Sequence, residues 1–168
     1  NLDIRVRHEV VAIHRDRKTV EVRNLETDQV FEAEYDHLVL SPGAAPVVPP
    51  LPGIDDACIL TLRNLQDMDR IAQRAKTAKN VLVIGAGFIG LEMAEQFCRL
   101  DKCVSLVELL PQVLPPLDPE MARVVESSLR QNGVELILGD GIRGFRREKG
   151  ALMAELNSGK EIEADLVI

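Results

Sequence analysis

Residues 81–90 read VLVIGAGFIG, in which a short apolar run leads directly into the pattern Gly-x-Gly-x-x-Gly. Such a run is typical of a parallel strand that is buried on both faces. Gly85 would permit a tight turn from strand to helix, Gly87 would let the backbone approach a pyrophosphate, and Gly90 would let the helix pack closely on the strand. The pattern therefore predicts a dinucleotide site, with the anion held by free amides at a helix N-terminus.

The residues after the glycines favour a dinucleotide fold over a chance glycine-rich turn. Apolar residues recur at helical spacing as far as Leu100, which predicts a helix with one face on a sheet. A second apolar run, residues 103–107, then ends at Glu108, 23 residues after Gly85. A carboxylate at the tip of that strand can accept hydrogen bonds from both ribose hydroxyls and would repel a 2′-phosphate. Glu108 is therefore predicted to bind the adenosine ribose and to favour NADH over NADPH.

Composition and charge exclude several functional classes. The 168 residues are 46% hydrophobic, and 27 acidic against 20 basic side chains give a net charge of −7. This balance argues against a nucleic-acid or anionic-membrane surface, and no apolar run is long enough to span a membrane. The three cysteines form no Cys-x-x-Cys pair, so neither a disulfide framework nor a metal site is expected. We expect a cytoplasmic protein with a small-molecule substrate. The chain opens at Asn1 without an initiator Met or signal peptide, so we expect a fragment of a longer protein.

The first 60 residues have a different pattern from the rest. Apolar and polar residues alternate over 6–13, 19–23 and 30–34, which predicts a β-meander. The run Leu38–Leu40 predicts a buried strand closed by a turn. Five prolines between residues 42 and 52 favour an extended path, and we place a domain crossover between Ala44 and Asp56.

The remaining residues predict alternating helices and strands. Asn64 would cap a helix over 65–76, and Asp118-Pro119 would begin a helix that Gly133 ends. Residues 109–117 are expected to form an irregular loop. The expected apolar face of the second helix consists of Met121, Val124, Val125, Ser128 and Leu129. Further strands are expected over 134–138, 141–147, 151–156 and 161–168, with a turn at 157–159.

The whole chain resembles the middle of the pyridine nucleotide-disulfide oxidoreductases, flavoproteins with one FAD-binding and one NAD(P)H-binding Rossmann domain. Residues 35–44, YDHLVLSPGA, are similar to the family's strand and Ala-Thr-Gly-Ala turn before the crossover, with Ser41-Pro42 replacing Ala-Thr. Together with TLRN at 61–64 and GFIGLE at 87–92, this resembles the branch of coenzyme A-disulfide reductases and NADH oxidases. The resemblance implies an α/β fold: a Rossmann-like NAD(H)-binding domain with a parallel sheet and a β-meander (58–168), preceded by a β-rich part of the FAD domain (1–57).

The resemblance also implies roles for individual residues on the NADH side. The pyrophosphate would be held by Gly85, Gly87 and Gly90 with the amides of Phe88 and Ile89. Phe88 matches an aromatic residue that lies over the flavin, although it could instead be a packing residue. Glu92 matches an acid near the nicotinamide amide, although it could instead be an acid in the first helical turn, favoured by the helix dipole.

On the FAD side the implied contacts come from three short segments. Val10 and Val11 match a strand whose backbone meets the adenine, although ordinary strand packing would also explain them. Ser41, Pro42 and Gly43 match the turn near the FAD diphosphate, and Arg63 is also expected to approach FAD.

The implied activity is hydride transfer from NADH to FAD, with electrons passing on to a disulfide of the coenzyme A type or to oxygen. The family's redox cysteine and first FAD motif would precede Asn1, and its dimer-forming domain would follow Ile168. The fragment alone is therefore not expected to turn over, and the intact protein is expected to be a homodimer. Two alternatives stay open: the NADH domain of a rubredoxin, ferredoxin or nitrite-type reductase, and a non-catalytic NADH-sensing module.

Overall fold

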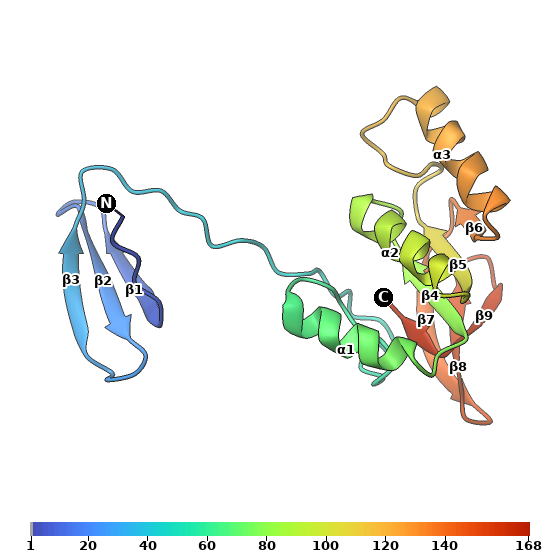
Figure 1. The fold of residues 1–168 in the computed structure, drawn as a ribbon, viewed down its shortest axis with the longest axis horizontal. Coiled ribbons are helices and arrows are strands. Elements are labelled where there is room, and N and C mark those ends of the chain that lie inside the picture. The colour runs from blue at the N-terminus through green and yellow to red at the C-terminus, as the bar shows by residue number, and fades with distance from the viewer. Residues whose placement is uncertain (1) are drawn as a thin grey trace. The chain divides into compact units, whose positions relative to one another are not determined.

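The computed structural model describes residues 2–168, which divide into two compact units between Ala44 and Ala45 (Figure 1). The first unit is an antiparallel sheet in the order β1-β2-β3. Its strands are β1 (His8–His14), β2 (Thr19–Asn24) and β3 (Val30–Glu34). The predicted β-meander is therefore confirmed, with β1 beginning two residues later than expected.

The pairing of β1 with β2 is interrupted by a β-bulge. Val10 pairs with Val22, and Ala12 pairs with the next residue of β2, Glu21, so Val11 has no partner opposite it. An extra residue of this kind bends the strand and leaves its own backbone outside the ladder.

The predicted buried strand at residues 38–40 is wrong. These residues have no regular structure, and Val39 keeps 84% of its surface exposed. A strand needs a neighbour to accept and donate its ladder hydrogen bonds, and in the described part of the chain no strand pairs with this segment. The apolar run was therefore not sufficient by itself to form a strand.

The second unit is built from three layers around a parallel sheet. The sheet has the order β10-β4-β5-β6, and its strands are β4 (Asn80–Ile84), β5 (Cys103–Glu108), β6 (Glu135–Leu138) and β10 (Leu166–Val167). The helices are α1 (Leu65–Ala75), α2 (Phe88–Arg99) and α3 (Pro119–Gln131). The third layer is an antiparallel sheet of β7 (Ile142–Glu148), β8 (Ala151–Leu156) and β9 (Glu161–Ala164). The predicted α/β fold is confirmed, and the last expected strand is divided between two sheets.

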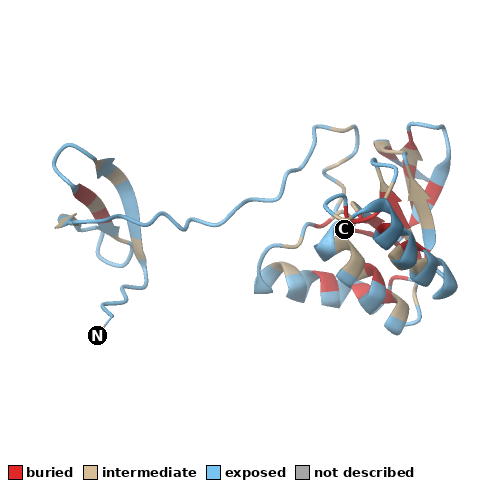
Figure 2. Ribbon diagram, turned by 90° about the horizontal axis from the view of Figure 1, so that it is seen from above, coloured by how far each residue is buried: buried red, intermediate tan, exposed pale blue. Residues whose placement is uncertain are grey.

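Successive residues of β4 pack on opposite faces of the sheet, and both faces are buried, which explains why the strand is apolar throughout. Val81 and Val83 belong to a core shared with the three helices, whereas Leu82 belongs to a second core shared with β7–β9. All three are at most 2% exposed, and Figure 2 shows buried residues both on strands and on helices of this unit. Because β4 is covered on both faces, the position of its end, where the glycines begin, is fixed by packing.

The helices α1 and α3 begin where the sequence predicted. Asn64 caps α1 by accepting the N–H of Asp67 at 2.9 Å, and the Asp67 carboxylate accepts the N–H of Asn64 at 3.3 Å. In α3 the proline occupies the first turn as expected, but the Asp118 side chain makes no capping hydrogen bond. This capping box satisfies two backbone N–H groups at the start of α1 with side chains close by in the sequence.

The predicted apolar face of α3 is partly wrong. Val125 and Leu129 pack on the helix-side core, but Met121 and Val124 are 58% and 64% exposed. The buried positions are instead Ala122 and Glu126. The face predicted from hydrophobicity is therefore displaced by about one residue from the buried face. The prediction excluded Glu126, but a carboxylate can occupy a buried position when it has hydrogen-bond partners.

None of the helices in the described residues has the length and hydrophobicity that crossing a bilayer requires.

Residues 52–58, near the start of the second unit, are held by polar contacts. The N–H of Phe145 donates to the carbonyl of Pro52 at 2.7 Å. The Arg147 guanidinium binds both carboxylate oxygens of Asp56, at 2.7 and 2.8 Å. These hydrogen bonds, with a smaller contribution from the N–H of Cys58, lower the pKa of Asp56 to about 2. The clamp attaches residues 52–58 to β7.

The clamp predicts a pH-dependent loss of stability. Because the folded pKa of Asp56 lies below its ordinary 3.8, the pair stabilises the fold above pH 3.8, and this contribution disappears as the pH falls through about 2. Asp56→Asn should lower the free energy of unfolding at pH 7 by about 1 kcal/mol, since Arg147 is nearly half exposed and water screens the pair. Urea titrations at several pH values measure this, with the exposed Asp55→Asn as control. A wild-type-to-variant difference that stays constant down to pH 2 would contradict it.

Candidate dinucleotide-binding site

The glycine turn joins the end of β4 to the start of α2 through three residues. Gly85 has φ +95°, a backbone conformation that side chains other than glycine rarely adopt. Its N–H donates to the carbonyl of Val107 on β5 at 2.8 Å. The predicted tight turn is confirmed, and the parallel pairing of β4 with β5 continues into it.

The second and third glycines serve different purposes. A Cβ at Gly87 would meet no atom within 4 Å, so its lack of a side chain leaves open space above the turn. A Cβ at Gly90 would lie 1.9 Å from the carbonyl oxygen of Gly85. Gly87 therefore keeps a surface accessible, as a pyrophosphate would require, whereas Gly90 is needed for packing. The packing partner is mainly the turn itself, with the Val83 side chain at 3.5 Å.

The N-terminus of α2 is free to receive an anion. Its N-cap, Gly87, has no side chain with which to cap the first amides, and the first turn contains no acidic residue. The amides of Phe88 and Ile89 belong to that turn, and the first amides of a helix have no partner within it. The partial positive charge at this end of a 12-residue helix is therefore uncompensated by side chains.

Glu108 lies at the end of β5 and connects the turn to the neighbouring strand. One carboxylate oxygen accepts the N–H of Ala86 at 2.6 Å, and the other accepts the N–H of Leu110 at 2.9 Å. Each carboxylate oxygen has two lone pairs, so both can still accept a ribose hydroxyl. The structure therefore brings Glu108 to the glycine turn as the spacing suggested, and it adds a bond within the protein that the sequence did not indicate.

The loop over residues 109–117 also belongs to the site, and the sequence analysis missed it. Val113 is fully buried and Leu114 is 7% exposed. The N–H of Leu114 donates to the carbonyl of Ala86 at 2.9 Å, so the loop contacts the glycine turn directly. The sequence feature that could have indicated this packing is the pair of adjacent apolar residues, Val113 and Leu114, before two prolines.

Apolar side chains surround the turn and are exposed in this unit. Phe88 and Ile89 keep 68% and 61% of their surfaces exposed, and Ile84 keeps 40%. Phe88 therefore does not belong to the core of the second unit, and its contact with the flavin stays a prediction. Exposed aromatic and aliphatic groups beside free amides suit a ligand with a flat ring next to a charged group.

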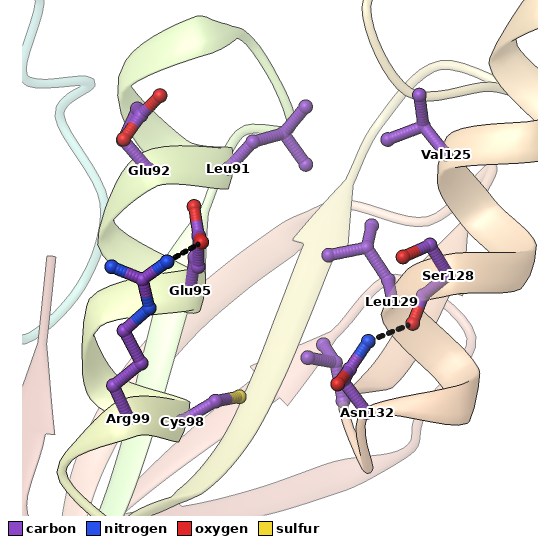
Figure 3. Close-up of a pocket in the computed structure, with 10 residues that line it drawn as sticks. Leu91, Glu92, Glu95, Cys98, Arg99, Val125, Ser128, Leu129 and Asn132 are labelled. Carbon is purple, nitrogen blue, oxygen red and sulfur yellow. Dashed lines mark hydrogen bonds and ion pairs between the residues drawn. The ribbon is translucent and has the colours of Figure 1, made fainter.

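Glu92 lies one turn further along α2 and is exposed. It is not in the first helical turn, so the helix-dipole alternative is wrong. It lines the edge of a groove of about 580 Å³ between α2 and α3, where Leu91 and Cys98 face Val125 and Leu129 (Figure 3). The contact of Glu92 with nicotinamide stays a prediction.

The residues predicted to meet FAD are exposed. In the first unit, Val10 and Val11 keep 53% and 38% of their surfaces exposed, and Val11 is the bulged residue of β1. Residues 41–43 have no regular structure, and Gly43 has φ +74°. In the second unit, Arg63 is exposed, and its N–H donates to the Asp67 carboxylate at 3.1 Å. These FAD contacts stay predictions.

Comparison with known proteins gives a family and several relatives. A family model described as pyridine nucleotide-disulphide oxidoreductase matches residues 1–168. An NADH oxidase from Enterococcus faecalis is 38% identical over 167 residues, which are 98% of this chain and 37% of that protein. The structure of reduced Bacillus anthracis CoADR-RHD matches with a TM-score of 0.87 and 43% identity, covering 99% of this chain and 30% of that one.

A water-forming NADH oxidase from Lactobacillus brevis, solved with NADH bound, matches with a TM-score of 0.84 and 34% identity over 96% of this chain. A mutant of it, engineered as an NADPH oxidase and bound to NADPH, matches with a TM-score of 0.82 and 33% identity. The chain spans 36% of each of these two structures and 37% of the curated oxidase. With the family model matched over its whole length, the chain belongs to the pyridine nucleotide-disulphide oxidoreductase family.

Proposed function

We propose that this chain is the NADH-binding part of a flavoprotein oxidoreductase. The observation that carries the proposal is the glycine turn: open space above Gly87, uncapped amides at the start of α2, and the Glu108 carboxylate 2.6 Å from the turn. These are the three features that a dinucleotide needs for its pyrophosphate and its ribose. The NADH bound to the Lactobacillus brevis oxidase supports the choice of nucleotide.

The residues of the turn fit the parts of NADH in order. The pyrophosphate would rest above Gly87 against the amides of Phe88 and Ile89, and the adenosine ribose hydroxyls would donate to Glu108. The nicotinamide half would extend past the exposed ring of Phe88. Bound NADH would supply a hydride and FAD would accept it, so the work of this chain is binding and orientation.

A preference for NADH over NADPH is supported by the engineered relative. Its five substitutions include a glycine and an aspartate 18 residues after that glycine. The other three are the two residues that follow the aspartate, an alanine and a methionine, and a proline seven residues after the aspartate. At the same spacing this chain keeps the glycine and the proline, has a glutamate in place of the aspartate, and has two leucines in place of the alanine and the methionine: Gly90, Pro115, Glu108, Leu109 and Leu110. Two of the new residues in the NADPH-bound form are arginines, which would attract a 2′-phosphate. This chain has neither arginine.

The electron acceptor that we propose is oxygen or a disulfide of the coenzyme A type. The support is the Enterococcus faecalis NADH oxidase and the Bacillus anthracis CoADR-RHD, which both match nearly all of this chain. We also propose FAD as the second cofactor, in contact with the bulge at Val10 and Val11 and with residues 41–43.

Substitution by alanine should have different effects at Gly87 and at Gly90. Gly87→Ala should leave the free energy of unfolding within about 0.5 kcal/mol of wild type, because the added methyl meets nothing. It should weaken NADH binding at least about tenfold, because that methyl occupies the pyrophosphate space. Gly90→Ala should instead cost about 1–3 kcal/mol, because the turn must move away from the new Cβ.

Calorimetric titration with NADH and urea unfolding measure the two quantities separately. Gly133→Ala, at a positive-φ glycine after α3 and away from the turn, is the control for general backbone strain. Tight NADH binding by Gly87→Ala would contradict the assignment of the turn to the pyrophosphate.

The double role of Glu108 predicts how its removal affects cofactor choice. Glu108→Ala should weaken NADH binding about tenfold or more, because it removes a charged acceptor of ribose hydroxyls and releases the N–H groups of Ala86 and Leu110. The affinity for NADPH should change less than the affinity for NADH, so the ratio between the two affinities should become smaller. Adding Leu109→Arg to Glu108→Ala should then improve NADPH binding.

Parallel titrations with both nucleotides test this, with Glu95→Gln on the exposed side of α2 as control. A wild-type chain that binds NADPH more tightly than NADH would show that Glu108 has been assigned wrongly.

A further inference from the structure

Glu126 is a buried acid that the proposed site does not yet use. It lies in the middle of α3, is 9% exposed, and is the one charged residue in the described part of the chain that is buried. Burying a carboxylate is unfavourable unless it has partners. Its neighbours on α3, Val125 and Leu129, pack against the helix-side core with apolar side chains, so the buried charge of Glu126 has to be explained by its polar partners.

The partners of Glu126 are a backbone N–H and an arginine. One carboxylate oxygen accepts the N–H of Val113 at 3.4 Å, and the other lies 3.6 Å from a guanidinium nitrogen of Arg130. Val113 is fully buried, and in the described residues no backbone carbonyl accepts its N–H. Glu126 therefore supplies the acceptor that a buried donor would otherwise lack.

The residue after Val113, Leu114, forms a hydrogen bond with the glycine turn. The N–H of Leu114 donates to the carbonyl of Ala86, and the N–H of Ala86 donates to Glu108. The Ala86 residue is thus held at its carbonyl by the 109–117 loop and at its amide by β5. Anything that releases the loop frees one of these two attachments.

We propose that Glu126 is a positioning residue for nucleotide binding. By holding Val113 it fixes the 109–117 loop, and through Leu114 it fixes the Ala86 carbonyl, so that the glycine turn and Glu108 are in place before NADH arrives. The inference rests on the proposed function, because it assumes that the turn binds NADH. A preformed site binds more tightly because less is ordered on binding.

The test compares two substitutions of Glu126 in the full chain. Glu126→Gln keeps an oxygen acceptor for the Val113 N–H, and its NADH affinity should stay within about threefold of wild type. Glu126→Leu removes the acceptor, and its dissociation constant for NADH should rise about tenfold. Glu120→Leu, at an exposed acid of the same helix, should bind as wild type does.

Hydrogen exchange of the Leu114 amide separates positioning from general stability. At a temperature where circular dichroism shows every variant folded, this amide should exchange faster in Glu126→Leu than in Glu126→Gln, while amides of β4 exchange alike. If Glu126→Leu does not fold, Glu126→Met, with a flexible side chain of similar volume, takes its place.

The outcomes distinguish the two proposals. A wild-type chain that does not bind NADH would overturn the proposed function, whereas the exchange of Leu114 would still test the role of Glu126 in the loop. Wild-type binding with equal affinity in Glu126→Leu would overturn the positioning role alone. Glu126→Gln binding as weakly as Glu126→Leu would also overturn it, because the acceptor would then not be what matters.

Discussion

The site depends on one hydrogen bond, in which the Glu108 carboxylate accepts the N–H of Ala86 at 2.6 Å. This bond joins the ends of β4 and β5 at the point where the chain leaves the sheet. It uses a charged acceptor, which makes it stronger than a bond between neutral groups. The same carboxylate is the proposed ribose ligand. One residue thus holds the turn in shape and is also proposed to bind the nucleotide, so its removal should affect both.

The three-layer packing explains why so small a feature can be held in place. Val81 and Val83 are packed against the helices and Leu82 against the β7–β9 sheet, so β4 cannot shift toward either layer without opening a cavity. The turn is then fixed from the strand side by Gly85 and from the loop side by Leu114. The N-terminal end of α2, which we propose binds the pyrophosphate, therefore lies at an edge of a well-packed sheet, where open α/β folds generally bind ligands.

Local patterns in the sequence predicted the strand, the glycine turn and the position of Glu108 well, and the surrounding structure less well. The glycine spacing, the apolar run of β4 and the distance to Glu108 are short-range features, and each was confirmed as structure. The failures involve partners distant in sequence. Residues 38–40 found no neighbouring strand, and the face of α3 was set by a buried Glu126 whose hydrogen-bond donor lies in a loop. The packing of Val113 and Leu114 likewise depends on contacts that apolar periodicity does not encode.

We propose above all that the turn from Gly85 to Gly90 binds the pyrophosphate of NADH. The most direct measurement is a titration of the 15N-labelled chain with NADH, followed by the chemical shifts of the backbone amides. We predict that the largest changes fall on the amides of residues 87–90 and on Leu110, whose N–H donates to the Glu108 carboxylate. Changes concentrated instead on Ser128 and Asn132, in the groove between α2 and α3, would contradict it.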